Sequence, residues 1–233
     1  STGRNYVLLL SLEKADGTGL AQISGDPQST ASATSLAGVW KGRGATVGYF
    51  YARLDEVPLT DVGAAAKAAY DFYVDSPAAR CVGPTSPAIV AVGLYVNEIE
   101  LGDDVIVMRS EFFDVERTVF MDGRRHPDNV ERTSQGYSIG WWEDDTLVIE
   151  SVGFNNESWL GWTGYIHSWD MTVTERIHRE GNTLHWEATV DDTMLLEPWT
   201  LDSQLSRLNP DPEAFFFGSV PCEERDAEHI VDP

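Results

Sequence analysis

Three glutamates stand in segments whose alternation of apolar and polar residues predicts strands, and each falls among apolar neighbours: Glu111, Glu150 and Glu175. A carboxylate on an apolar face loses hydration, which favours its neutral form unless a cation or several hydrogen-bond donors compensate. Groups of this kind transfer protons in active sites, and we expect Glu150 and Glu175 to form a proton-transfer pair. Two alternatives stay open: these faces are solvated, or the glutamates form structural bridges with Arg109, Arg117 or Arg176.

Two histidines, His126 and His167, follow turn-rich stretches, where a side chain can reach the mouth of a cavity held by a rigid scaffold. An imidazole titrates near neutral pH, so each could serve as a general acid or base. The alternative role is a hydrogen bond that fixes a loop. Tyr137 could donate a hydrogen bond to developing negative charge. The predicted catalytic set is therefore Glu150, Glu175, His126, His167 and Tyr137.

Aromatic residues are dense between positions 137 and 169, and they could line a pocket for a partly apolar ligand. The alternative is ordinary packing in the core or at its rim. We predict a ligand-binding set that joins some of these aromatics to nearby charged residues: Glu111, Arg109, Trp141, Trp142 and Phe154.

A metal centre has little support in the sequence. His178 and His185 are expected to lie opposite each other across a hairpin, where neighbouring imidazoles can share an ion. An exposed polar face explains the pair as well, and we favour that interpretation. The chain has no His-Glu-x-x-His, paired Cys-x-x-Cys or calcium-loop pattern. We therefore expect neither a metal nor another cofactor.

Two β-hairpins must position the two leading glutamates. Gly181-Asn182 tolerates the backbone of a tight turn, and a two-residue turn there sets Glu175 opposite Ala188 within an apolar stripe. In the same way, a turn at Asp144-Asp145 sets Glu150 opposite Ile139.

The same register pairs Tyr137 with Val152 beside Glu150. A third hairpin, 105–114 returning through 117–122, places Glu111 on the side of Val105, Val107 and Phe113.

The rest of the chain predicts a mainly β protein with short turns. Apolar runs at 6–11, 36–41 and 47–52 indicate strands, and from position 88 onward strand follows strand. Residues 59–73 predict one helix, capped by Thr60. We predict an antiparallel, lipocalin-like β-barrel with one short helix, in a single domain over 1–233. Residues 1–35 form its N-terminal section, a strand and a loop rich in Ser, Thr and Gly, and 210–233 form an irregular tail.

Composition limits the possible partners. With 16 Lys and Arg against 38 Asp and Glu, the formal net charge is −22, which disfavours nucleic-acid binding. No apolar run approaches the roughly 18 to 20 residues that span a bilayer, so we expect no membrane insertion. Cys81 and Cys222 could form a disulfide in an oxidising compartment, or remain two separate thiols. A start at Ser1 fits removal of an export signal and equally fits trimming.

An ordered string of motifs runs through residues 117–200. It comprises Met-Asp-Gly-Arg at 121–124 with His126-Pro127, Gly-Tyr-Ser-Ile-Gly-Trp-Trp-Glu-Asp-Asp-Thr-Leu-Val-Ile-Glu at 136–150, Gly-Phe-Asn at 153–155, His167-Ser168, Val-Thr-Glu-Arg at 173–176 and Asp191-Asp192. This string resembles a family of exported bacterial proteins with no established activity, and Arg80-Cys81, Pro84 and Cys-Glu-Glu at 222–224 also fit. The resemblance implies export and a β-rich fold. This chain has Asp144 where members usually carry Gly.

These observations predict a periplasmic or secreted enzyme that performs acid–base chemistry without a metal on a small organic, partly apolar ligand inside the barrel. Its reaction is of the lyase, isomerase or hydrolase type. The alternative is a non-catalytic periplasmic binding or carrier protein for a small hydrophobic ligand, which is favoured if arginines hold the glutamates. A third possibility is a structural or interaction domain, which a filled barrel favours. The sequence does not assign an oligomeric state.

Overall fold

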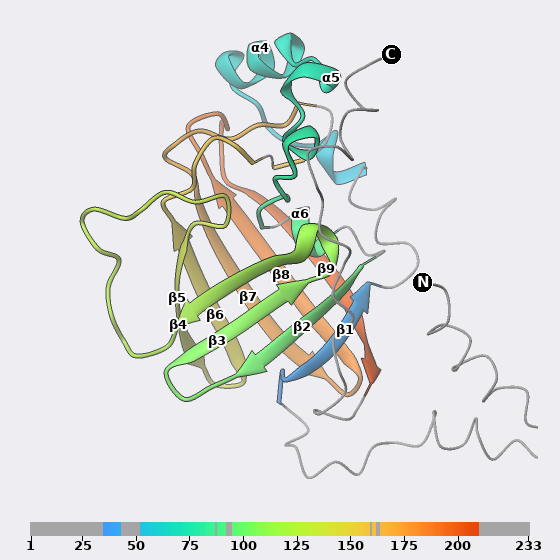
Figure 1. The fold of residues 1–233 in the computed structure, drawn as a ribbon, viewed down its shortest axis with the longest axis vertical. Helices are drawn as coiled ribbons and strands as arrows, with labels where there is room; N and C mark the ends of the chain where they lie inside the picture. The colour runs from blue at the N-terminus through green and yellow to red at the C-terminus, as the bar shows by residue number, and fades with distance from the viewer. Residues whose placement is uncertain are drawn as a thin grey trace, which may run out of the picture. The chain divides into compact units, whose positions relative to one another are not determined.

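A closed β-barrel dominates the computed structural model, which describes residues 35–42, 52–86, 88–91, 95–158, 160–161 and 164–209 (Figure 1). Its strands neighbour one another in chain order, and β9 closes on β1. They are β1 (Gly38–Gly42), β2 (Val96–Leu101), β3 (Val105–Ser110), β4 (Val115–Phe120), β5 (Tyr137–Glu143), β6 (Thr146–Val152), β7 (Thr172–Glu180), β8 (Thr183–Asp191) and β9 (Trp199–Asn209). The predicted β-barrel is thereby confirmed, while the likeness to lipocalins stays a prediction.

The predicted helix is present as α4 (Asp61–Ala69), and the Thr60 side chain accepts a hydrogen bond from the Gly63 amide as its cap. It ends earlier than expected because Tyr70 takes an extended conformation. The other helices are short: α5 (Phe72–Asp75), α6 (Ala88–Ala91) and the 3-10 turns η1 (Pro77–Arg80) and η2 (Phe112–Asp114). Residues 52–54 are also helical. The helices α4 and α5 lie together at one end of the barrel (Figure 1).

Both leading hairpins have the predicted register. In β7–β8, Glu175 pairs with Ala188 and His178 pairs with His185. In β5–β6, Glu150 pairs with Ile139 across a two-residue turn. The first residue of that turn, Asp144, has φ +53°, a left-handed conformation that favours glycine.

The third predicted hairpin differs from the expectation. Strand β3 ends at Ser110, which pairs directly with Val115, so Glu111 lies in the turn and not on a strand face. Phe113 and Asp114 supply positive φ angles of +60° and +52° there, which explains how a tight turn forms without glycine.

One neighbouring pair is parallel. Strands β4 and β5 meet through only two residue pairs, Val119 with Ser138 and Phe120 with Ile139, whereas the other neighbours are antiparallel. A parallel pair requires a long connection, supplied here by residues 121–136. We call this contact the β4–β5 seam. The loop approaches the sheet closely: a Cβ at Gly140 would meet Met121 Sδ at 2.7 Å.

The barrel interior is packed with apolar side chains that alternate along the strands. Its fully buried members include Leu147, Ile149, Val173, Ile177, Leu184, Val190 and Leu205. Thr85, Ser86 and Ala88, from the segment that leads into α6, are also fully buried. The fold therefore covers a polar segment as well as the apolar core.

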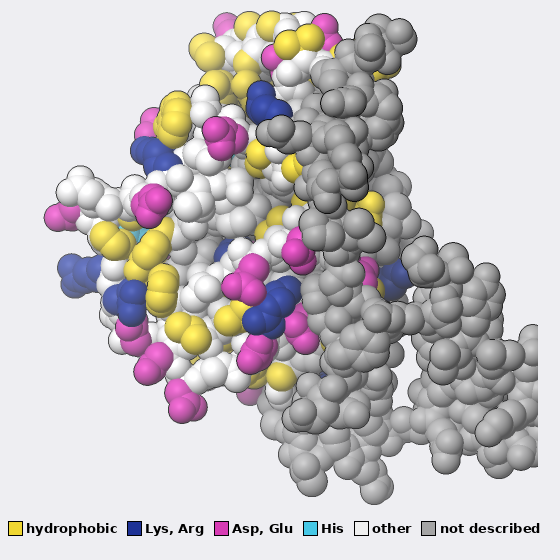
Figure 2. Space-filling view, viewed as in Figure 1, with side chains coloured by type: hydrophobic (Ala, Val, Ile, Leu, Met, Phe, Trp, Pro, Cys, Tyr) yellow, Lys and Arg dark blue, Asp and Glu magenta, His cyan; other side chains and the backbone are white. Residues whose placement is uncertain are grey.

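Acidic side chains outnumber basic ones on the barrel face shown in Figure 2, and apolar side chains gather over α4 and α5. That apolar group includes Val62, Phe72 and Val74, which are 65, 48 and 69% exposed. Within the described part of the chain, no helix has the length and apolar character needed to cross a bilayer.

Several sequence predictions lie outside the described residues: the strand at 6–11, the loop of the N-terminal section up to residue 34 and the tail at 210–233. The strand predicted at 47–52 also lies outside them, except for residue 52, which is helical and not part of a strand. The prediction of a single domain over residues 1–233 stays a prediction. Cys81 is disulfide-bonded. The chain contains just one other cysteine, Cys222, which lies outside the described residues.

Candidate functional site

Glu175 points into the barrel, as predicted, and is completely buried. Arg117, itself 7% exposed, donates to both of its carboxylate oxygens at 2.5 and 3.2 Å. Ser86 Oγ and Trp186 Nε1 also donate to Glu175 Oε1, at 2.7 and 2.9 Å. Glu175 is therefore a fixed structural anion, which is the arginine-bridge alternative considered from the sequence.

Little free space remains around this pair. A cavity of about 20 Å³ is lined in part by Asn97, Met108, Ser110, Arg117 and Trp186. A buried water needs at least about 10–15 Å³ of such space, so the cavity fits about one water molecule. The expectation of an organic ligand beside Glu175 inside the barrel is wrong for the described residues, because side chains fill that interior.

Glu150 lies on the opposite face of the sheet from Glu175. Its neighbours in β6, Ile149 and Ser151, are both fully buried, and Ile149 pairs with Glu175, so Glu150 points to the outer face. Its side chain is 41% exposed. The prediction that Glu150 and Glu175 act as one interior pair is therefore wrong. The alternation of apolar residues predicted the wrong face for Glu150, because Val148 on the outer face of β6 is also buried.

Glu150 has a histidine partner. His126 Nε2 lies 3.0 Å from Glu150 Oε1, and the histidine comes from the connection that precedes β5. With a carboxylate acceptor at this distance, Nε2 carries the proton and donates it. The other ring nitrogen, Nδ1, is buried without a hydrogen-bond partner among the described residues.

Tyr137 completes this outer-face group. Its ring meets the His126 ring edge-on at 5.9 Å between centroids, and its hydroxyl accepts a hydrogen bond from Arg124 at 3.2 Å. Arg124 is held by Asp122, and its hydrogen bonds lower the pKa of Asp122 to about 2. The structure thus brings together His126, Glu150 and Tyr137 from the predicted catalytic set.

A broad groove of about 620 Å³ lies next to this group. Residues 127–132 and 169–172 line it together with Val152 and Gly153, and we call it the outer-face groove. Val152 follows Glu150 by two residues on the same face of β6, about 7 Å along the strand. Residue 127 directly follows His126. The histidine–glutamate pair therefore lies near the groove, although neither side chain lines it.

Sequence reasoning missed two groove residues, Arg132 and Trp169. Trp169 is 47% exposed, and the Arg132 guanidinium lies 5.0 Å from its ring centroid. Arg132 also donates to the backbone carbonyls of Phe154 and Trp169, which holds the two sides of the groove together. Trp169 was part of the aromatic cluster seen in the sequence, and its position in the irregular segment after His167 was an available signal.

His167 is not part of this group. It is 3% exposed, its Nδ1–H donates to the Ser168 carbonyl, and Ser158 Oγ lies 3.0 Å from its Nε2. Burial lowers the pKa of His167, so the neutral ring is favoured. His167 therefore fixes a loop, which is the alternative considered from the sequence, and it does not stand at a cavity mouth.

The predicted ligand-binding residues do not form one pocket. Arg109 is bound by Glu98, Glu100 and Glu116 on the outer face of the barrel. Glu111 accepts a hydrogen bond from the Val96 amide in its turn.

The predicted aromatics are also separated. Trp141 and Trp142 are 39 and 45% exposed near the β5–β6 turn, and Phe154 is completely buried. The expectation that these residues shape an interior pocket is wrong.

Comparison of the chain with protein-family models, with curated proteins and with solved structures gave no match.

Proposed function

We propose that the protein is an enzyme that performs proton-transfer chemistry on a small, partly apolar molecule held in the outer-face groove. Glu150 is the proton-transfer group, His126 orients it, and Tyr137 supplies a hydrogen bond to developing negative charge. The reaction belongs to the lyase, isomerase or hydrolase type. The observation that carries the proposal is the 3.0 Å contact between His126 and the partly exposed Glu150, whose respective neighbours Pro127 and Val152 line a ligand-sized groove.

The contact leaves Glu150 with one engaged and one available oxygen. His126 binds Oε1, whereas no hydrogen bond to Oε2 from a described residue is present. A carboxylate whose orientation is fixed by one partner can accept a proton at its second oxygen from a bound molecule. Exposure of 41% allows such a molecule to reach it.

The groove suits a molecule with a flat or apolar face. Its volume of about 620 Å³ falls within the range of about 300–1,000 Å³ found for small-molecule sites. Trp169 offers an exposed indole on which a ring can stack, and Arg132 beside it offers a positive charge. Acidic neighbours, Asp128, Glu131 and Asp170, disfavour a strongly anionic substrate.

A binding protein without turnover is the second candidate, and one observation favours it. His126 Nδ1 is enclosed, so a bound molecule reaches that nitrogen only if the 121–136 loop moves. In a binding protein, the contact between His126 and Glu150 serves only to hold the 121–136 loop on the sheet.

The test begins with a ligand search that follows tryptophan fluorescence, comparing the wild type with Trp169→Phe. Compounds that bind are then assayed for conversion. We expect Glu150→Gln to lower kcat by about 10²- to 10⁴-fold with little change in KM, the usual contribution of a general acid or base. His126→Gln should alter the pH dependence of kcat, because it removes the group that orients the carboxylate.

Glu116→Gln is the matched control, since Glu116 is an exposed carboxylate on another strand and should leave kcat unchanged. Conversion that Glu150→Gln leaves within about threefold of wild type contradicts the proposed role of Glu150. Saturable binding that depends on Trp169, with no conversion of any bound compound, establishes the carrier function instead.

We also propose that the protein acts in an oxidising compartment such as the periplasm or the extracellular space. The disulfide at Cys81 supports this, because such bonds persist mainly outside the reducing cytosol. Nonreducing mass spectrometry of protein isolated from its native cells tests it, and detection of two free thiols contradicts it.

A further inference from the structure

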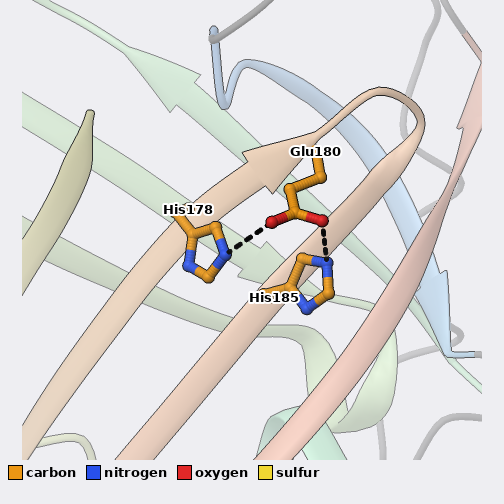
Figure 3. A group of neighbouring side chains, drawn as sticks. All are labelled: His178, Glu180 and His185. Carbon is orange, nitrogen blue, oxygen red and sulfur yellow. Dashed lines mark ion pairs between the residues drawn. The ribbon is translucent and has the colours of Figure 1, made fainter.

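The tip of the β7–β8 hairpin carries two histidines and a glutamate on its outer face. His178 and His185 face each other across the strands, and Glu180 follows His178 by two residues on the same face (Figure 3). The turn after Glu180 contains two residues and begins with Gly181 at φ +56°. A short turn of this kind fixes the register, so the hairpin holds these three side chains together.

The two imidazole rings are stacked, with 4.7 Å between centroids and 5° between planes. Both direct Nε2 toward Glu180, at 3.7 Å from one carboxylate oxygen for His178 and 3.5 Å from the other for His185. The potential ligand atoms all lie within 4.8 Å of one another. Since both contacts exceed hydrogen-bonding distance, direct hydrogen bonding does not account for the arrangement.

We propose that His178, Glu180 and His185 bind a Zn²⁺ ion or a similar late first-row divalent metal. In a tetrahedral zinc site with bonds of about 2.0–2.2 Å, neighbouring ligand atoms lie about 3.4 Å apart. The two histidine–glutamate distances are within a few tenths of an ångström of that value, and each ends on a different oxygen of Glu180, so both carboxylate oxygens face the histidines. Rotation of the imidazole rings brings the two nitrogens closer, and water completes the coordination.

The ligand set selects the class of metal. Imidazole nitrogen with one carboxylate suits Zn²⁺, Cu²⁺ or Ni²⁺, whereas Ca²⁺ and Mg²⁺ require mostly oxygen ligands. The charges nearby also favour a cation: Glu187 and Asp202 line the groove beside the histidines, and Arg176 in that groove is paired with Glu143. This inference differs from the sequence expectation of no metal, because the structure adds the carboxylate of Glu180 to the two imidazole rings.

The site is independent of the proposed enzyme, since it lies at the β7–β8 turn and shares no residue with the outer-face groove. Its ligands are accessible, with side chains 43, 72 and 27% exposed for His178, Glu180 and His185. Substitutions there should therefore leave the fold intact, and far-UV circular dichroism checks that condition.

Isothermal titration of the full, tag-free chain with ZnCl₂, after removal of metal with EDTA, tests the proposal. We expect one Zn²⁺ per chain and no comparable binding of Ca²⁺ or Mg²⁺. His185→Gln and Glu180→Gln should each weaken binding at least about tenfold, since loss of even a group that only orients a metal ligand commonly costs about 10- to 100-fold. Histidine ring signals in the NMR spectrum should shift for His178 and His185 and not for His126.

Glu187→Gln is the matched control, because it removes a negative charge from the same face without removing a proposed ligand. It should change the affinity by less than about threefold. Three results overturn the proposal: no saturable Zn²⁺ binding, equal loss of affinity in Glu187→Gln and Glu180→Gln, or Ca²⁺ binding as tight as that of Zn²⁺. The first result would show that the three side chains form no metal site, and the other two would show that the general charge of an acidic surface attracts the metal.

Discussion

The buried ion pair of Arg117 and Glu175 should be strongly coupled, and a double-mutant cycle can measure this. Glu175→Gln leaves the Arg117 charge buried without a counterion, and Arg117→Met leaves the Glu175 charge in the same position. Breaking a buried pair on one side typically costs about 3–5 kcal/mol of unfolding free energy. That is a large share of the roughly 5–15 kcal/mol that stabilises a domain.

The double variant, Arg117→Met with Glu175→Gln, buries no charge. Its glutamine oxygen can still accept the hydrogen bonds from Ser86 and Trp186, so those donors keep their partner. We therefore expect the double variant to be at least about 2 kcal/mol more stable than either single variant. Urea unfolding, followed by tryptophan fluorescence and far-UV circular dichroism, gives the unfolding free energies of the two single variants and the double variant.

The exposed pair of Arg109 and Glu116 offers a parallel control cycle, with expected coupling of about 0.2–1 kcal/mol. The reasoning fails if the losses of the two Glu175–Arg117 single variants add in the double variant. It also fails if each single variant loses less than about 1 kcal/mol, since the interior charge would then be solvated.

Three further predictions concern stability. Because burial lowers the pKa of His167 from its ordinary 6.5, the unfolded chain alone gains this proton just below pH 6.5. Stability should therefore fall with decreasing pH, by at most about 1.4 kcal/mol per unit for this group, until the folded pKa is reached. Urea unfolding at several pH values should show a shallower loss in His167→Gln, and equal slopes would contradict this. Asp144→Gly should raise the free energy of unfolding by up to about 1 kcal/mol, because glycine adopts the left-handed conformation of residue 144 without strain. Asp145→Gly should lower the free energy of unfolding. Changes of the same sign in both variants would contradict the turn geometry. Thr60→Ala should lower the free energy of unfolding by about 1 kcal/mol through loss of the α4 cap, and Thr60→Ser should retain most of that stabilisation. Equal melting curves for the wild type and Thr60→Ala would show that the cap does not stabilise the protein.

The hairpins could be predicted because their information is local. Gly181-Asn182 sets the turn, and the period of two along the strands then places Glu175 inside and the two histidines outside. The sequence offers three arginines as possible partners of the glutamates and does not identify which of them binds Glu175. Arg117 belongs to β4, which is joined to this half of the barrel by the β4–β5 seam, and no local pattern reports such a long-range contact.

The position of Glu150 could not be predicted for a different physical reason. Strand β6 is buried at three consecutive positions, 147–149, so both of its faces carry apolar side chains. Alternation identifies which residues share a face, but it does not identify the inner face when both are covered. The outer-face groove was likewise hidden, because it forms between the irregular segments 127–132 and 169–172.

The narrowness of the β4–β5 seam has a consequence for how the barrel closes. Strands β5 to β9 form a continuous series of antiparallel neighbours, whereas the seam joins this series to β4 through two residue pairs. We expect the antiparallel series to assemble first, because its contacts are closer in sequence. Strands β4 and β5 should pair at the seam in a later step of folding. Amide hydrogens at Val119 and Phe120 should then exchange faster than those of β7 and β8. His126 lies in the 121–136 loop that connects the two strands of the seam. Brief opening of the barrel at the seam would therefore separate His126 from Glu150 while most of the sheet remains folded.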